Sequence, residues 1–361
     1  MTVPASVPTK VAVCCGVGGT GKTTISAALA VSYATSGERV VVLTIDPARR
    51  LADALGVDAL DNVPRRVAVP GVSGTVDALM LDRKSTWDEV IRRRATPETA
   101  ERLLANRYYR AVSTRLSGSH EYMAVEKLYE LVASGAYDRV VVDTPPTQHV
   151  VDFFRAPDRV RAILDRSMLS LLDTTGGSLR GVAARGALSI VNRLAGDKVL
   201  GEIREFFDLI ADLSAGFRER SDTVATLLQA PDTAYWLVTD ANAPERNDLL
   251  GFLEELRSRG MSFAGFLVNR VQAPPTGTFP SRQALLAAGR GVDGWADAVE
   301  AIARLPESAR ALADAHRRAI AELVRGAGGA PAWLVPEIPG GIRSVTGLTD
   351  VARCLPPRPP V

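Results

Sequence analysis

The sequence predicts an α/β fold, a doubly wound and mostly parallel β-sheet that is interrupted by a helical insertion. Three observations lead to this prediction. Short apolar runs with the composition of buried strands alternate with segments of helical periodicity along most of the chain. The first of these strands leads through a glycine-rich loop directly into a helix. Between residues 157 and 230 the alternation stops, and apolar residues recur at helical spacing alone.

The composition is that of a large globular protein with little net charge. The chain has 361 residues, of which 46% are hydrophobic, enough to bury a large core. Its 43 basic and 41 acidic residues leave a net charge of +2, so nothing favours nucleic acid as a partner. The three cysteines, Cys14, Cys15 and Cys354, form no C-x-x-C pair, and no apolar run approaches the roughly 20 residues that span a bilayer. We therefore expect a cytoplasmic protein with at most peripheral membrane contact.

A glycine-rich loop follows the first apolar run, residues 10–15. The loop consists of Gly16, Val17, Gly18, Gly19, Thr20, Gly21, Lys22, Thr23 and Thr24. It meets the pattern G-x-x-x-x-G-K-[ST] of a phosphate-binding P-loop, and residues 25–33 are predicted to be helical. Glycines let successive N–H groups point at an anion, Lys22 reaches the β- and γ-phosphates, and the Thr23 hydroxyl ligates Mg²⁺. ATP and Mg²⁺ are the predicted ligands, and the alternative is a glycine-rich turn without a ligand.

Two further buried strands end in aspartates. The apolar run at residues 39–45 ends in Asp46, at the edge of the sheet where α/β proteins bind ligands, although an aspartate before proline can also simply open a helix. The run at residues 137–143 ends in Asp143 and matches a Walker B element, in which the aspartate holds a Mg²⁺-bound water. Two prolines within residues 144–149 form a stiff turn beside the expected γ-phosphate, the place for a sensor loop.

Residues 157–230 are predicted to form the helical insertion. Two apolar stripes at helical spacing lie in it, separated by a glycine-rich stretch at residues 176–181. Both stripes can pack on the body or on each other. The alternative is an exposed apolar groove that binds a segment of a partner protein.

The remaining elements are assigned from periodicity and turn residues. Residues 61–75 are predicted as loop, 76–82 as a strand, and 85–134 as helices broken near Pro97 and Gly118. After the insertion we expect strands at 235–239, 263–268 and 333–335. Helices are expected at 245–259 and 344–354, and a helical stretch is expected to run from the loop at 272–280 to about residue 324. Residues 336–341 are predicted as a second loop.

Three motifs in order carry a family resemblance: residues 16–24, then residues 44–49 with Leu51 and Asp53, then residues 143–149. On these motifs the chain resembles the family of the arsenite-pump ATPase and the ATPase that guides tail-anchored proteins to membranes, within the deviant-Walker group of P-loop proteins. It is most similar to the actinobacterial members. The resemblance covers nearly the whole chain. It implies an ATPase core at residues 1–156 and 231–361, with a helical subdomain at 157–230.

The resemblance also implies roles for individual residues. Asp46 corresponds to the switch I aspartate that orients or activates the attacking water, and Asp143 with the following loop corresponds to switch II. Asn269 corresponds to an asparagine that reads adenine, and the loop that covers the base corresponds to Pro336, Glu337 and Ile338. Asn242 stands in place of a glutamate that contacts nucleotide in trans. Such ATPases are dimers that close over two nucleotides and open after hydrolysis, which moves the helical subdomain.

The chain departs from this family at several points. The signature lysine near the start of the loop is Val17 here, and a valine cannot reach across a dimer to the partner's phosphates. The zinc-binding C-x-x-C of some members is absent from the sequence. Cys14 and Cys15 are neighbours in a strand and should point to opposite sheet faces, so the sequence does not favour an arsenite site.

The predicted function is a Mg²⁺-dependent ATPase switch that uses Lys22 and Asp46 in hydrolysis and couples opening and closing of a dimer to a protein client or partner. Because Val17 replaces the trans lysine, a sharper hypothesis pairs this chain with a paralogue that retains that lysine. Two alternatives remain. One is a regulatory subunit that binds ATP without hydrolysing it. The other is a small-molecule kinase or ligase, for which the sequence shows no acceptor motif.

Overall fold

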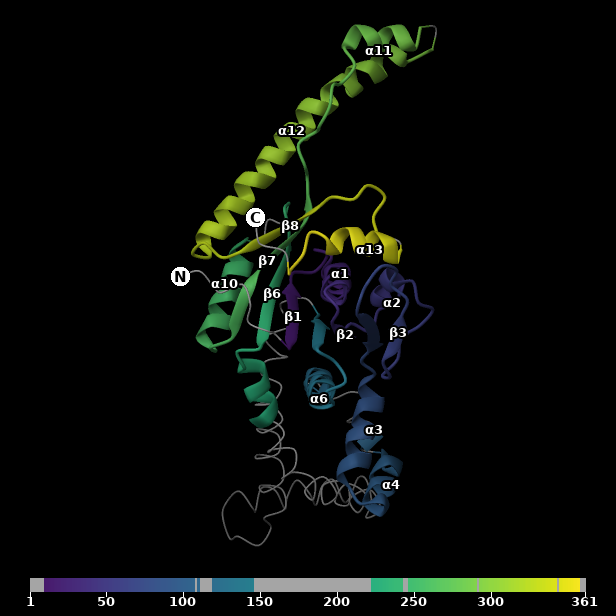
Figure 1. Ribbon diagram of the computed structural model, residues 1–361, viewed down its shortest axis with the longest axis vertical. Coiled ribbons are helices and arrows are strands. Elements are labelled where there is room, and N and C mark those ends of the chain that lie inside the picture. The colour runs from purple at the N-terminus through teal and green to yellow at the C-terminus, as the bar shows by residue number, and fades with distance from the viewer. Residues whose placement is uncertain are drawn as a thin grey trace, which may run out of the picture.

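The strands form one twisted sheet that runs through the middle of the protein (Figure 1). The computed structural model describes residues 10–107, 109–110, 119–145, 222–242, 246–290, 292–342 and 344–357. Eight strands in these ranges lie in the order β3-β4-β2-β5-β1-β6-β7-β8. They are β1 (Val11–Gly16), β2 (Arg39–Thr44), β3 (Arg65–Val67), β4 (Thr75–Met80), β5 (Arg139–Asp143), β6 (Thr233–Asp240), β7 (Ser262–Val271) and β8 (Ala332–Pro336). The predicted α/β class is confirmed.

Strand β1 occupies the centre of the sheet, where all six of its residues are buried. It pairs in parallel with β5 on one side and β6 on the other. The strands that follow β1 lie on both sides of it, β2 to β5 on one side and β6 to β8 on the other. The carboxyl end of β1 therefore lies at the switch point where open α/β sheets bind ligands. Cys14 and Cys15 belong to the core clusters on opposite faces of the sheet, as predicted.

Helices cover both faces. They are α1 (Lys22–Thr35), α2 (Arg50–Leu55), α3 (Arg83–Arg94), α4 (Pro97–Ala105), α6 (Ser119–Ala133), α10 (Arg246–Ser258), α11 (Arg282–Ala288), α12 (Trp295–Gly326) and α13 (Val345–Ala352). Apolar residues of α1, α2 and α13 form one core cluster with the sheet, and those of α6 and α10 contribute to the other. The break expected near Pro97 is present, since the Thr96 side chain caps α4 by accepting a hydrogen bond from the Thr99 N–H.

Residues 61–75 are not all loop, contrary to the prediction. Strand β3 lies within them and pairs antiparallel with β4 at the edge of the sheet. Its residues Arg65 and Arg66 are exposed and only Val67 is buried, so no apolar run marks the strand. Pairing to β4 and an ion pair between Arg66 and Asp77 hold it in place instead.

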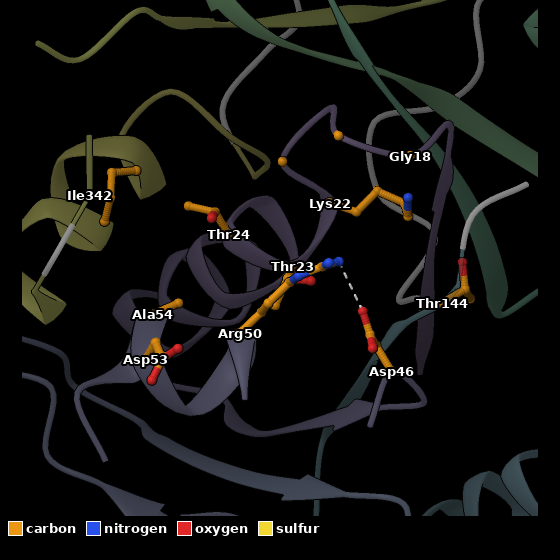
Figure 2. A pocket seen from close by; sticks show the side chains of 12 residues that line it. Gly18, Lys22, Thr23, Thr24, Asp46, Arg50, Asp53, Ala54, Thr144 and Ile342 are labelled. Atoms are coloured by element: carbon orange, nitrogen blue, oxygen red, sulfur yellow. Dashed lines mark hydrogen bonds and ion pairs between the residues drawn. The ribbon is translucent and has the colours of Figure 1, made fainter. Parts of the chain in front are cut away.

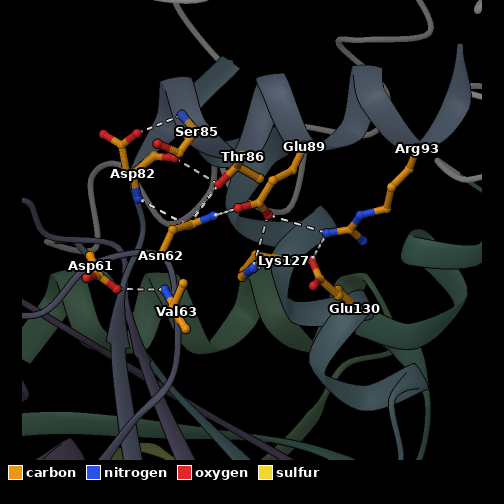
Figure 3. A network of polar contacts seen from close by, with 10 residues as sticks. All are labelled: Asp61, Asn62, Val63, Asp82, Ser85, Thr86, Glu89, Arg93, Lys127 and Glu130. Carbon is orange, nitrogen blue, oxygen red and sulfur yellow. Dashed lines mark hydrogen bonds and ion pairs between the residues drawn. The ribbon is translucent and has the colours of Figure 1, made fainter. Parts of the chain in front are cut away.

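A polar network ties α3 to α6 beneath the sheet edge (Figure 3). The Lys127 ammonium, whose side chain is 5% exposed, lies 3.3 Å from both Glu89 and Glu130. Arg93 reaches the same two carboxylates from α3. A buried cation needs such partners, because leaving it unpaired costs several kcal/mol in order of magnitude. The network therefore fixes how α3 and α6 pack.

Helix α12 extends far beyond the sheet and carries α11 near its outer end (Figure 1). It continues for 32 residues through Pro306, and the chain reaches it from the carboxyl end of β7. Among the residues that the structure describes, no helix combines the length and apolarity needed to cross a membrane. Of the insertion expected at 157–230, only residues 222–230 belong to the described ranges, and 222–229 are helical.

Candidate nucleotide-binding site

The glycine-rich loop joins the end of β1 to the start of α1, and a cavity of about 530 Å³ opens beside it (Figure 2). Gly21 caps α1 in a left-handed conformation, without a side chain that accepts from the helix N–H groups. The first turn of α1 contains no acidic residue. These N–H groups and the positive end of the helix dipole are therefore available to an anion. The cavity is lined by Gly18, Gly19, Gly21, Lys22, Thr23, Thr24, Asp46, Arg50, Asp53, Ala54, Thr144 and Ile342.

Two glycines of the loop are required for different reasons. A Cβ on Gly16 would overlap the carbonyl oxygen of Val238 on β6, which is backbone and cannot swing aside. Gly21 has a φ of 85°, and a Cβ there would also overlap the Asn269 amide. The sequence motif thus reflects close approach at one end of the loop and left-handed backbone at the other.

The Val17 carbonyl oxygen holds the loop closed. It accepts hydrogen bonds from the Lys22 ammonium and from the Thr20 hydroxyl, each at 2.9 Å. Burial lowers the pKa of Lys22, which the nearby Asp143 carboxylate partly offsets. The Val17 side chain is half-buried and packs against the core. The side chain at position 17 therefore packs within its own subunit. The positive charge of the loop is that of Lys22.

Asp143 lies fully buried behind Thr23. Its carboxylate accepts hydrogen bonds from Thr44 at 2.9 Å, from Ser26 at 3.4 Å and from the Thr23 hydroxyl. Burial raises the pKa of Asp143 to about 6, and the hydrogen bonds from Thr23 and Thr44 act in the opposite direction. The Thr23 hydroxyl lines the cavity and the Asp143 carboxylate lies directly behind it, and both are oxygen ligands of the kind that suits Mg²⁺. The two residues predicted for the metal therefore meet in the fold and fit that ion.

Asp46 lines the cavity from the segment between β2 and α2. One carboxylate oxygen accepts from the Ala48 N–H at 2.9 Å and the other from the Arg50 guanidinium at 3.1 Å. The Asp46 N–H donates to the Thr44 hydroxyl oxygen at 3.3 Å, and that hydroxyl donates to Asp143. Thr44 therefore links the two aspartates that the sequence analysis selected.

The residues predicted to bind the base lie on the β7 and β8 side. The Asn269 amide donates to the Thr20 carbonyl at 3.0 Å, so it touches the loop itself. Pro336 ends β8, the Glu337 N–H donates to the Val271 carbonyl at 3.0 Å, and Ile338 packs against the core. Their contacts with adenine stay predictions.

Asn242 lies elsewhere, at the base of α12. Its side-chain oxygen is 2.7 Å from Nε2 of His316, whose Nδ1 accepts from the Gln272 N–H at 3.0 Å. Because Nδ1 accepts, Nε2 carries the proton that is donated to Asn242. The predicted contact of Asn242 with a nucleotide in trans therefore stays a prediction. Residues 146–149 of the expected sensor loop lie outside the described residues.

Ile342 and Arg50 at the cavity, and Arg270 beside the loop, were not singled out from the sequence, whereas Thr144 is the first residue of the expected sensor loop. Thr144 lines it and donates to the Cys14 carbonyl at 2.7 Å, and Ile342 lines the side towards α13. Arg270 donates to the Gly19 carbonyl at 3.2 Å and to Asp240 at 3.0 Å, which braces the loop from outside. A usable signal existed for Arg50, because it follows Asp46 by four residues, the spacing of an ion pair on a helical turn.

The sequence matches ATPases among known proteins, in agreement with a loop that can bind an anion. Residues 9–271 match the sequence model of a family described as anion-transporting ATPase. A protein named ATPase ASNA1 homolog from Babesia bovis is 33% identical over 165 residues, which are 46% of this chain and 43% of that protein. One of the same name from Cryptosporidium parvum is 23% identical over 264 residues, covering 72% of this chain and 64% of the relative. The protein named ATPase get3 from Aspergillus terreus is 24% identical over 274 residues, 73% of each chain. The chain thus spans less than two thirds of the first two relatives.

Proposed function

Because the chain belongs to the anion-transporting ATPase family, we propose that it is a Mg²⁺-dependent switch that hydrolyses ATP to ADP and phosphate in the cavity beside the loop. The observation that supports this most directly is the link from Asp46 through Thr44 to Asp143. A group that positions water and a group that holds the metal must move together if nucleotide state is to control conformation. One shared hydroxyl provides that connection.

Each residue has a defined task in the proposed reaction. The N–H groups of the loop and the Lys22 ammonium hold the β- and γ-phosphates, and Asn269 lies next to the base. Asp46 orients a water whose oxygen bonds to the γ-phosphorus while the bond to the β–γ bridging oxygen breaks and ADP leaves. Thr23 and Asp143 would hold Mg²⁺, directly and through a water. When bound, Mg²⁺ neutralises charge on the β- and γ-phosphates.

The proposed switch acts on a second subunit and a client. Val17 packs into its own core and offers no cation to a neighbour, so a paralogue with a lysine at this position would complete the site of this chain in a heterodimer. The helical insertion at residues 157–230, between core segments 1–156 and 231–361, is the proposed binding region for a protein client. We propose the cytoplasm as the compartment.

Turnover of Mg²⁺-ATP by the purified chain tests the proposal. We expect Asp46→Asn to lower kcat by about 100-fold, because it removes the group that orients water, and to leave ATP affinity nearly unchanged. Asp61→Asn is the matched control, since Asp61 is exposed and pairs with Arg65 before β3. Measurable and equal turnover by wild type and Asp46→Asn would refute the catalytic role of Asp46.

The same assay distinguishes an ATPase subunit that needs a paralogue from a regulatory subunit that binds ATP without hydrolysing it. Binding of ATP without turnover, restored when a lysine-bearing paralogue is added, would support the heterodimer. A stable homodimer that hydrolyses ATP would refute it. Binding without turnover under both conditions would instead identify a regulatory subunit.

A further inference from the structure

The cavity holds two cationic side chains among the described residues that line it, Lys22 and Arg50. They come from opposite sides, Lys22 from the start of α1 and Arg50 from the start of α2 (Figure 2). Lys22 is buried and donates to the loop's own Val17 carbonyl. The Arg50 side chain is 71% exposed and donates to Asp46. The two cations therefore differ in freedom, and only Arg50 can change partner by simple rotation.

We propose that Arg50 binds the γ-phosphate of ATP from within the same subunit, exchanging Asp46 for that phosphate when ATP enters. The inference rests on the proposed function, because it takes the cavity to be the ATP site. It gives Arg50 the position on the Asp46 side of the γ-phosphate, opposite Lys22. Arg50 would thus supply the second cation that the half-buried Val17 does not provide.

The chemistry of the pair favours this exchange. The Arg50 side chain is 71% exposed and that of Asp46 is 24% exposed, so water and salt screen the pair chiefly at the arginine and keep it weak. A phosphate presents more charge and several oxygens to the planar guanidinium, which can bind two of them at once. Neutralising the γ-phosphate while it is transferred is also the task for which arginine is used in other phosphoryl-transfer sites.

The exchange would also prepare Asp46 for its role. In the structure one Asp46 oxygen accepts from Ala48 and the other from Arg50. When Arg50 turns to the phosphate, the second oxygen becomes available to a water, while the Ala48 bond keeps the carboxylate oriented. ADP has no γ-phosphate, so Arg50 would return to Asp46 after phosphate leaves. The pair would therefore report the state of the nucleotide.

Arg49 provides a matched control. It precedes Arg50 directly, yet its guanidinium donates to the Asp58 carbonyl. It lines a separate cavity of about 180 Å³ together with Leu51 and Met80. Loss of Arg49 removes the same charge from the same segment without touching the nucleotide cavity. Both variants are expected to fold, which thermal melting checks, because Arg50 is largely exposed and Arg49 bonds a surface carbonyl.

The experiment compares affinities for Mg²⁺ complexes of a non-hydrolysable ATP analogue and of ADP in wild type, Arg50→Ala, Arg50→Lys and Arg49→Ala. We expect Arg50→Ala to weaken analogue binding about ten-fold and ADP binding less than two-fold, in keeping with loss of a charged hydrogen-bonding group. Arg50→Lys should recover part of the lost affinity for the ATP analogue, because lysine keeps the positive charge but lacks the planar guanidinium that binds two oxygens at once. Where wild type turns over, kcat of Arg50→Ala should fall at least ten-fold.

An unchanged ratio of the two affinities in Arg50→Ala would overturn the proposal. So would an equal loss for both nucleotides, which would mean that Arg50 only shapes the cavity. A changed ratio in a protein whose wild type shows no turnover, either alone or with a lysine-bearing paralogue, would support the Arg50 assignment while refuting the proposed hydrolysis. The binding measurement therefore distinguishes failure of this inference from failure of the proposed function.

Discussion

Helix α1 follows the glycine-rich loop at the central strand β1, whereas α12 follows α11 and leads into β8 at the edge of the sheet. Eleven of the fourteen residues of α1 are buried, whereas four of the 32 residues of α12 are. Alanine and serine on α1 allow sheet and helices to approach it from several directions. Helix α12 is buried at only a few positions, Val299 in its first turns and Ala313, His316 and Leu323 in its second half. Packing along most of its length therefore positions α1, whereas α12 is held by a few contacts, most of them in its second half.

The distribution of exposed apolar side chains repeats the contrast. Six large ones are exposed in the described part of the chain, and five of them lie on α12 or in the segments that lead to it: Phe279, Val292, Ile302, Leu305 and Leu312. Val63, the sixth, lies in the loop before β3. None of the six lines the cavity beside the loop, whereas five lie on α12 and the segments that lead to it, which we call the arm.

The same substitution in both helices should break or confirm this comparison most clearly. Leu29 of α1 is fully buried, so Leu29→Ala removes packed methyl groups and leaves a cavity. We expect the free energy of unfolding to fall by about 3 kcal/mol. Leu305→Ala in α12 should change it by less than about 0.5 kcal/mol, because that side chain is 62% exposed. Urea titrations of both variants measure the two values, and similar losses would show that the arm is packed in solution.

A clash at the start of the loop is expected to have the next largest effect. Gly16→Ala places a methyl group against the Val238 carbonyl, so β1 and β6 must separate. We expect a loss of about 2 kcal/mol in the free energy of unfolding, together with loss of ATP binding, because the loop is displaced with the strand. Wild-type stability with intact binding would mean that the sheet yields there without cost.

A polar contact at the base of the arm should have a smaller and local effect. His316 is buried and bridges Gln272 to Asn242, so His316→Ala leaves the Gln272 N–H and the Asn242 oxygen without this partner. We expect hydrogen exchange in α12 to become faster by an amount equal to about 1 kcal/mol, with little change near the loop. Arg317→Ala is the control, since its side chain is 68% exposed, and an equal effect there would contradict a specific role for His316.

The loop and its helix could be predicted from sequence because each geometric demand selects a residue type. Close approach requires Gly16, left-handed backbone requires Gly21, and the proposed phosphate site uses Lys22. Strand β3 could not, because an edge strand held by arginine pairs carries no apolar run. The four-residue spacing predicts that Arg50 pairs with Asp46, but whether the pair lines the cavity depends on how α2 packs after β2.

The arm shows a different limit of sequence reasoning. The pattern of α12 predicts a helix, and a helix is present. The same apolar stripe, however, is typical of helices that lie against a core, and its middle section here faces solvent around Leu305 and Leu312. Whether a stripe is covered depends on distant parts of the chain, so periodicity identifies the element and leaves its burial open.

The smallest expected effect is a gain in stability at a glycine that nothing requires. Gly251 lies within α10, has helical backbone, is exposed, and has no atom within 4 Å of where a Cβ would stand. Gly251→Ala should therefore raise the free energy of unfolding by about 0.7 kcal/mol, because alanine loses less backbone entropy on folding. Chemical denaturation of Gly251→Ala and Gly16→Ala in one experiment measures the expected gain and the expected loss in the free energy of unfolding. A loss at Gly251 would mean that this face of α10 is covered in solution, and the contrast between buried core and exposed periphery would have to be redrawn there.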